Sequence, residues 1–139
     1  MGCWLVKSDP DTYGWKDLVR DGKTCWDGVR SFAARSHLRG MKPGDEVLFY
    51  HSGTERAVVG GARVASDPYP DPTAKEEDWT AVDIAPAWAL RTPVGLPQIK
   101  SEASLKNIRL VKEGRLSVMP LEKVELEKIV GMGGGRVTL

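Results

Sequence analysis

Short apolar runs, most of them bounded by Gly, Pro, Asp or Ser, recur along the chain and predict its strands. Most alternate or are too brief for a helix, so we predict strands at 3–7, 45–51, 57–66, 79–90 and 115–120. Gly60 and Gly61 lie inside the third of these and predict a β-bulge or a close backbone contact.

Helices are predicted between these strands, where glycine or proline supplies a stop signal. Their expected ranges are 14–22, 28–40, a short helix and turn at 96–107, and 121–131. In the second helix Val29, Phe32, Ala33 and Ser36 should share an apolar face. The proline-rich segment 66–78 is expected to be a loop, and the glycine-rich C-terminus a mobile tail.

Short strands mixed with short helices, without a β-α-β rhythm, favour an α+β fold. We therefore predict a small bent β-barrel of mixed or antiparallel strands with short helices at its flanks. The 139 residues suit one core. The expected organisation is a single domain at 1–131 followed by a flexible tail at 132–139.

Composition narrows the class of protein. The chain is 41% hydrophobic and 28% charged, which is typical of a soluble globular domain. No apolar run approaches the roughly 20 residues that span a bilayer, so no membrane partner is expected. Two cysteines and no signal peptide at the N-terminus favour a reducing cytoplasm, and we expect a monomer. The net charge of +1 means that any nucleic-acid role would depend on a local basic surface and a specific pocket.

One pair of residue types in the sequence could support catalysis. Cys25 could act as a nucleophile with His37 or His51 as its base, and Asp27 or Asp45 could orient the imidazole. Nothing in the spacing of these residues supports that arrangement. The two histidines and the scattered carboxylates also lack the spacing of a metal site, so neither a metal nor a cofactor is expected.

Binding has more support, at the polar end of the strand in "DEVLFYHSG". Tyr50 and Ser52 should point to one face, and His51 to the other. Trp26 precedes the helix predicted at 28–40, so Trp26 and Tyr50 together could hold a planar ring between them. The alternative is that both are core aromatics whose polar atoms are satisfied.

Four motifs occur in a fixed order: "WLVKSDPDTYGW", "WDGVRSFAARSHLRGMKPGDEVLFYHS", "YPDPT" and "LVKEGRLSVMP". Together they resemble the EVE domain family from about residue 3 to about residue 130. The resemblance implies a PUA-like bent β-barrel with flanking helices. It also implies a reader that takes one modified base of DNA or RNA into an aromatic-lined pocket, and it implies no cofactor and no reaction.

The resemblance also suggests which residues bind the ligand. Aromatic rings would stack on the base, serine hydroxyls would bond its edge, and basic side chains would meet the flanking phosphates. The motif positions carried over are Lys7, Ser8, Trp26, Arg30, Tyr50, His51, Ser52, Arg115, Leu116 and Ser117, with Arg35 and Arg39 as weaker phosphate contacts. The chain departs from the family at Ser31, Ala33 and Ser36, where amide side chains are common, so its preferred base could differ.

The resulting hypothesis is a non-catalytic domain that binds nucleic acid or a nucleotide carrying a modified base. Two alternatives remain open at this point. The first is a small enzyme that acts on a nucleoside or a small amide in the same pocket. The second is a protein-interaction module. Structural roles are equally open for Arg115, which could pair with Asp83, and for His51, which could bond to the backbone.

Overall fold

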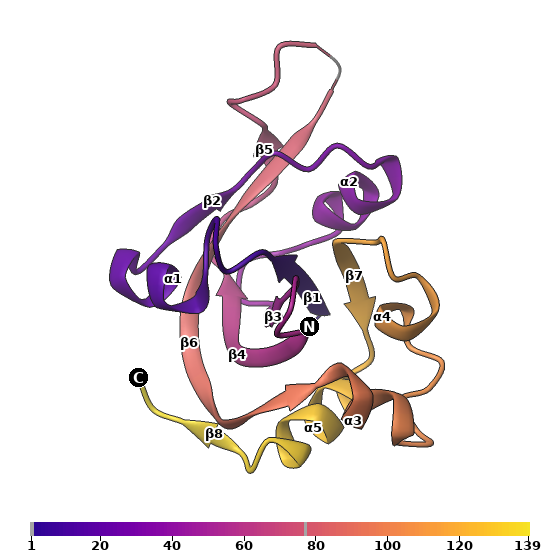
Figure 1. The fold of residues 1–139 in the computed structure, drawn as a ribbon. Helices are drawn as coiled ribbons and strands as arrows, with labels where there is room; N and C mark the ends of the chain where they lie inside the picture. Colours follow the sequence, from indigo (N-terminus) through magenta and orange to yellow (C-terminus); the bar gives the residue numbers. More distant parts are fainter. Residues whose placement is uncertain (1, 77) are drawn as a thin grey trace.

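The computed structural model describes residues 2–76 and 78–139, and within them the chain forms strands interleaved with short helices (Figure 1). The strands are β1 (Cys3–Ser8), β2 (Thr24–Trp26), β3 (Glu46–His51), β4 (Ala57–Val64), β5 (Tyr69–Pro70), β6 (Thr80–Gly95), β7 (Val118–Leu121) and β8 (Arg136–Val137). The helices are α1 (Trp15–Asp21), α2 (Phe32–Arg39), α3 (Leu96–Ser101), α4 (Arg109–Lys112) and α5 (Lys123–Met132).

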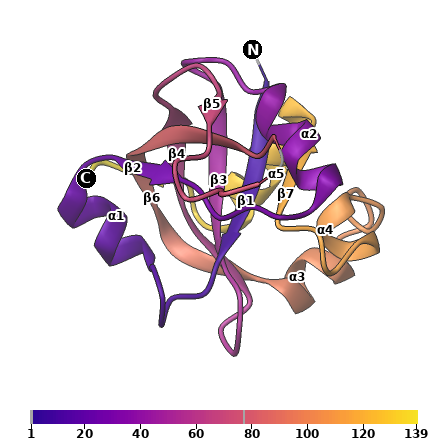
Figure 2. The same cartoon turned by 90° about the horizontal axis from the view of Figure 1, so that it is seen from above.

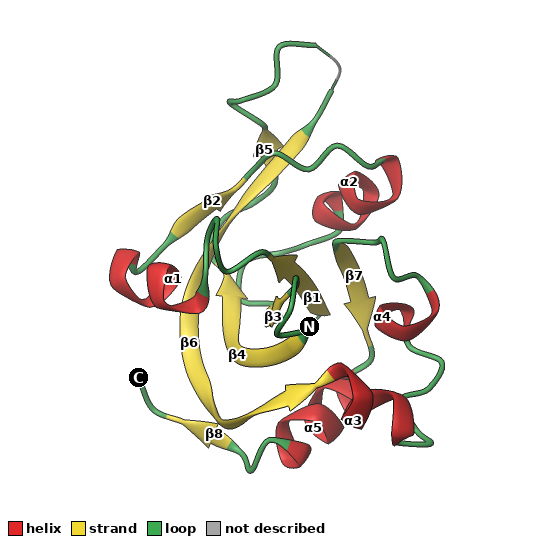
Figure 3. Cartoon of the chain, viewed as in Figure 1, coloured by secondary structure: helices red, strands yellow, loops and turns green. Residues whose placement is uncertain are grey.

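One mixed sheet organises the molecule, in the order β2-β6-β4-β3-β1-β7, with β5 and β8 also paired to β6. The pair β1 and β3 is parallel, and the other neighbours are antiparallel. The long β6 bends along its length, so the sheet curls into a half-barrel (Figure 3). The predicted PUA-like α+β fold, a bent sheet with short flanking helices, is therefore confirmed.

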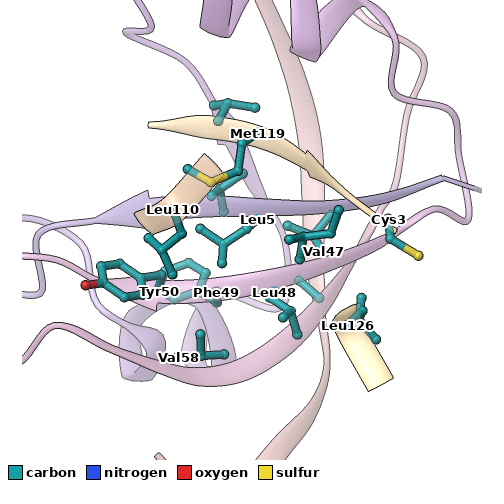
Figure 4. Close-up of a cluster of buried hydrophobic side chains, with 14 of the residues drawn as sticks. Cys3, Leu5, Val47, Leu48, Phe49, Tyr50, Val58, Leu110, Met119 and Leu126 are labelled. Atoms are coloured by element: carbon teal, nitrogen blue, oxygen red, sulfur yellow. The ribbon is translucent and has the colours of Figure 1, made fainter. Parts of the chain in front are cut away.

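The core lies inside the curl of the sheet, and α2, α3 and α4 lie along one side of the sheet (Figure 2). Side chains that point inward from β1, β3 and β7 meet residues of the C-terminal helices there (Figure 4). Leu5, Phe49, Met119 and Leu126 are among the fully buried ones. Burial of large apolar side chains is the main stabilising contribution in such a fold.

Gly60 and Gly61 in β4 are required by two tryptophans. A Cβ on Gly60 would lie 2.5 Å from the Trp15 ring, and one on Gly61 would lie 2.2 Å from the Trp88 ring. The pairing register of β4 shifts beside both glycines, between Val58 and Gly60 and again between Gly61 and Ala62. The predicted bulge and the predicted close contact are both confirmed.

The second predicted helix, 28–40, is wrong at its start. Gly28 has φ +75°, which is incompatible with a right-handed helix, and residues 28–31 have no regular secondary structure. Ser31 is the N-cap of α2 and accepts a hydrogen bond from the Ala34 amide (3.3 Å). Because α2 starts at Phe32, the side facing the core carries Ala34 and Leu38 and is not the apolar face predicted from the sequence.

Other differences concern the end of β6 and several short elements. The strand predicted at 79–90 continues to Gly95, and β2, β5 and α4 were not expected from the sequence. The segment predicted as a mobile tail contains β8, in which Arg136 and Val137 pair with Leu90 and Ala89 of β6. Two- and three-residue strands have too little sequence pattern of their own to be recognised.

Candidate functional site

A cavity of about 670 Å³ opens where β1 and β2 end. Its walls come from the end of β1 and the loop after it, from β2 and the connection to α2, and from Ser117 just before β7. Ligand pockets for small molecules have volumes of about 300–1,000 Å³. The volume is therefore in the range that holds a nucleoside-sized ligand.

Trp26, the last residue of β2, supplies an aromatic wall of this cavity. Its ring meets the buried Phe49 edge to face, with ring centroids 5.7 Å apart and an interplanar angle of 79°. Pairing of β2 with β6, with Trp26 opposite Val82, fixes the backbone that carries it. An aromatic ring held in this way is ready to stack on a planar ligand at little cost in conformational entropy.

Asp71, in the "YPDPT" motif, holds the segment after Trp26, which forms part of the cavity wall, by hydrogen bonds. Its side chain is fully buried and accepts hydrogen bonds from the amides of Gly28 (2.8 Å) and Thr73 (2.7 Å), from the Thr73 hydroxyl (2.6 Å) and from Arg30 (2.9 Å). Burial alone would raise the pKa of Asp71, but these hydrogen bonds outweigh it and hold the pKa well below the usual range. Arg30 therefore lines the cavity in an orientation fixed by a buried carboxylate.

Several polar residues line the cavity. Ser8 donates a hydrogen bond to the Tyr13 carbonyl, which leaves its oxygen able to accept another. Lys7 also lines the cavity, but its ammonium group donates to the carbonyl of Gly114 (2.8 Å), which lines a second cavity, and partial burial lowers the pKa of that group. Asp27 is exposed and brings a carboxylate to the rim. Donors and acceptors are thus both present beside an aromatic wall.

Cys25 also lines the cavity, and its environment keeps the thiol protonated. Burial raises the pKa of Cys25 more than its hydrogen bond with Tyr69 lowers it. Tyr69 donates to the Asp83 carboxylate (2.5 Å), and burial together with this bond raises the pKa of the phenol far above its ordinary value. A thiol with a raised pKa is a poor nucleophile at neutral pH.

Trp26 and Tyr50, which were predicted to lie together, are on opposite faces of the sheet. Trp26 packs against Phe49, whereas Tyr50, the next residue of β3, points to the opposite face of the sheet. Tyr50 is 3% exposed and lies beside Leu110 and Val58 (Figure 4). The expectation that Trp26 and Tyr50 hold a planar ring between them is therefore wrong.

Tyr50 and Ser52 instead line a second cavity of about 310 Å³. Lys7 lines both cavities, and its ammonium nitrogen lies 5.8 Å from the centroid of the Tyr50 ring. The two cavities thus meet the strand end from opposite faces of the sheet. Of the ten motif positions carried over, five line the first cavity: Lys7, Ser8, Trp26, Arg30 and Ser117.

The remaining predicted positions have other surroundings. His51 accepts a hydrogen bond from the Trp15 amide (2.9 Å), and its other ring nitrogen lies 2.7 Å from Glu55, so it fits the structural alternative. Leu116 is buried in the core. Arg115 is exposed and lines neither cavity, and Asp83, its suggested partner, binds Tyr69.

The two arginines proposed as weaker phosphate contacts lie on α2, beyond the rim. Arg39 pairs with Asp78 (2.7 Å) and donates to the Thr80 hydroxyl (2.9 Å). Arg35 lies over the rings of Phe32 and Trp79. Among the three departures from the family pattern, Ser31 lines the cavity, whereas Ala33 and Ser36 are exposed positions of α2 that do not.

The groups considered for catalysis do not form an active site in the described part of the chain. His37 bonds to Arg109 (3.1 Å) and His51 to Glu55, and neither histidine lines the cavity with Cys25. Within residues 2–76 and 78–139, no cluster of three or more His, Cys, Asp or Glu side chains could hold a metal ion. In the same residues, no helix is long and apolar enough to cross a membrane.

Several cavity residues were not selected from the sequence as ligand contacts. They are Asp9, Thr12, Tyr13, Cys25, Asp27, Gly28, Val29 and Ser31. All of them adjoin or lie within the first two motifs. The sequence therefore indicated the segments that form the cavity, but it did not indicate which side chains point into it. Asp71 was hidden because its role depends on a contact 43 residues away, with Gly28.

Comparison with known proteins places these observations in a family. The family model of the EVE domain matches residues 2–132. Thymocyte nuclear protein 1 of Homo sapiens is 31% identical, and the alignment covers 93% of this chain and 72% of that protein. Protein Rpa0253 of Rhodopseudomonas palustris has a similar structure, with a TM-score of 0.92 and 38% identity over 96% of this chain and 94% of the other.

Two further structures carry methylated nucleic acids. Human THYN1 protein in complex with DNA containing 5-methylcytosine has a TM-score of 0.86 and 30% identity, over 96% of this chain and 98% of the other. The YTH domain of Zygosaccharomyces rouxii MRB1 protein, in complex with N6-methyladenosine RNA, has a TM-score of 0.61 over 99% of this chain and 88% of the other. At 15% identity, the second likeness concerns the fold alone.

Proposed function

Because the chain belongs to the EVE domain family, we propose that it is a non-catalytic domain that takes a modified nucleobase of DNA or RNA into the cavity beside Trp26. The observation that carries this proposal is a cavity of about 670 Å³ that is lined by a fixed aromatic ring and several polar residues. Support comes from human THYN1, a relative with 30% identity whose structure contains 5-methylcytosine DNA.

Different residues of the cavity contact different parts of the base. Trp26 stacks on the flat face of the base. Asp27 accepts a hydrogen bond from an exocyclic amino group, as acidic side chains do with cytosine N4. Ser8 and Ser117 bond the remaining edge atoms, since both hydroxyls lie on the cavity wall. A base inside the cavity must leave its stack, so the domain acts on a single strand or on a flipped nucleotide.

Basic side chains near the rim hold the strand that carries the base. Arg30 lines the cavity, Arg35 and Arg39 follow on α2, and Lys7 lies at the end of β1, where its ammonium group bonds to Gly114. Their number is small and the chain has a net charge of +1, so phosphate contacts alone would give weak binding. Specific affinity must therefore come from the cavity.

The surroundings of the candidate nucleophile support binding without catalysis. A raised pKa keeps Cys25 protonated, and both histidines are bonded elsewhere. The two free cysteines fit a reducing compartment, so we place the protein in the cytoplasm, where it acts as a monomer.

A binding screen tests the proposal. Modified and unmodified nucleosides, and short DNA and RNA strands that contain them, are titrated against the protein by calorimetry. We expect one modified base to bind most tightly and Trp26→Ala to weaken that binding about 5- to 150-fold, the range of one lost stacking contact. Asp27→Asn should weaken it about tenfold if the base offers an amino group.

Tyr50→Phe serves as the control, because Tyr50 lies on the other face of the sheet. The proposal fails if no member of the panel binds, or if Trp26→Ala binds as tightly as the unaltered protein while remaining folded. A substrate that is turned over during the titration would favour the alternative of a small enzyme.

A further inference from the structure

An exposed aromatic stack lies next to the cavity. Phe32 is 63% exposed, and its ring stacks on Trp79 with centroids 5.4 Å apart and an interplanar angle of 14°. The other large apolar side chains that are exposed in the described part of the chain, Val19, Val124 and Leu139, are aliphatic. An aromatic ring that is held by a second ring and is mostly exposed to solvent is a surface on which another planar group can stack.

Two guanidinium groups lie against this stack. The Arg35 guanidinium lies 4.8 Å from the centroid of Phe32 and 5.0 Å from that of Trp79, and Arg30 lies 5.6 Å from Trp79. Asp71 pairs with Arg30, whereas Arg35 donates to the backbone carbonyl of Asp78 (3.2 Å). Within the described residues no ion pair to a carboxylate neutralises Arg35, so the stack carries positive charge beside its apolar surface.

The stack is continuous with the rim of the cavity. Arg30 and Ser31 line the cavity, and Phe32 is the next residue of the chain. Arg30 contributes to both places, because it faces the cavity and also lies against the Trp79 ring. A strand whose base enters the cavity therefore passes within reach of Phe32.

We infer that Phe32 and Trp79, with Arg30 and Arg35, form an aromatic platform that stacks on the nucleobase adjacent to the one in the cavity. The inference rests on the proposed function and adds a second contact on the same strand. When a base leaves its stack, its neighbour loses a stacking partner, and an aromatic side chain can replace that partner. The positive charge of Arg35 complements the phosphate that joins the two nucleotides.

The experiment compares strand binding with nucleoside binding. The probes are a single-stranded 12-nucleotide DNA with one central 5-methylcytosine, the same strand with cytosine, and free 5-methyl-2′-deoxycytidine. The variants are Phe32→Ala, Phe32→Trp and, as a matched control at another exposed apolar position, Val124→Ala (69% exposed). Thermal unfolding confirms that each variant folds.

We expect Phe32→Ala to weaken binding of both 12-nucleotide strands by the same factor, about 5- to 150-fold, which corresponds to one stacked base. Binding of the free nucleoside should not change, because the nucleoside has no neighbouring base. Phe32→Trp should keep strand binding, and Val124→Ala should not affect it. The dependence of strand affinity on salt should remain the same in Phe32→Ala, since stacking releases no counterions.

The outcomes separate this inference from the proposed function. If the strands bind but Phe32→Ala binds them as the unaltered protein does, or weakens the nucleoside equally, there is no platform. If neither strand binds the unaltered protein, the platform is also refuted, because it should contribute to any strand. If Phe32→Ala weakens both strands while methylation and Trp26→Ala have no effect, the platform stands and the proposed cavity function falls.

Discussion

Replacing Asp71 with asparagine should weaken the hydrogen bonding that joins the Thr73 loop to the cavity wall. The carboxylate oxygens of Asp71 accept four hydrogen bonds, two from Thr73 and one each from Gly28 and Arg30. An asparagine has one acceptor oxygen and one amino group in their place. The most favourable arrangement keeps the oxygen toward Gly28 and Arg30 and turns the amino group toward the Thr73 hydroxyl, which can accept.

The cost of the substitution follows from what remains unsatisfied. The Thr73 amide, whose hydrogen bond to Asp71 is partly buried, then faces another donor, and loss of such a partner costs about 1–3 kcal/mol. Arg30 loses its charge partner, which adds about 1 kcal/mol because its side chain is 41% exposed. We therefore expect Asp71→Asn to lower the free energy of unfolding by about 2–4 kcal/mol at pH 7.

Urea unfolding, followed by tryptophan fluorescence, measures this loss. With a slope of about 2 kcal/mol per molar urea, the midpoint should fall by about 1–2 M. Asp67→Asn is the matched control, because Asp67 is an exposed carboxylate in the same segment. The reasoning would be refuted if Asp71→Asn unfolded at the same urea concentration as Asp67→Asn and the unaltered protein.

The pH dependence gives an independent check on the charge of Asp71. The pKa of Asp71 is held below its usual range in the folded protein, so its contribution is complete above the unfolded value of about 4. It is lost as the pH falls from there through the depressed folded pKa. The stability difference between the unaltered protein and Asp71→Asn should therefore be constant from pH 5 to 8 and shrink below about pH 4.

Three further predictions concern other parts of the molecule. Gly61→Ala should destabilise the fold by about 1–3 kcal/mol in urea unfolding, since its Cβ would lie 2.2 Å from the Trp88 ring; Gly114→Ala, with open space around it, should cost less than 1 kcal/mol. Tyr50→Phe should leave ligand affinity within about twofold in calorimetry, because its cavity is on the opposite face of the sheet; a tenfold loss would contradict the separation of the two cavities. Cys25 should react with iodoacetamide more slowly than free cysteine at pH 8 and approach the same rate only at higher pH, because burial raises its pKa; equal rates at pH 8 would contradict that shift.

The sequence contains enough local pattern to define most of the sheet. Alternating or continuous apolar runs predicted the strands that became β1, β3, β4 and β6, because side-chain period and burial are properties of neighbouring residues. The two adjacent glycines of β4 also predicted a close contact from local sequence alone. Local pattern could not predict the start of α2, because the left-handed conformation of Gly28 prevents the helix from beginning there.

The candidate site could be predicted only in part. Motif membership selected five residues that line one cavity, because they end or adjoin elements that converge: Lys7, Ser8, Trp26, Arg30 and Ser117. It failed for Tyr50, since a strand places neighbouring side chains on opposite faces and the sequence does not say which face meets Trp26. The separation of the two aromatic rings is a consequence of how the sheet curls.

The amino-acid sequence by itself determined the family, the class of fold and the stretch of chain around which the cavity forms, because each depends on ordered local motifs. The tertiary structure alone decided which side chains share that cavity. Asp71 lies 43 residues from Gly28 along the chain and hydrogen-bonds its amide, and Phe32 meets Trp79 across a similar separation. Contacts of this kind arise when the curled sheet brings distant loops together, and spacing along one chain does not encode them.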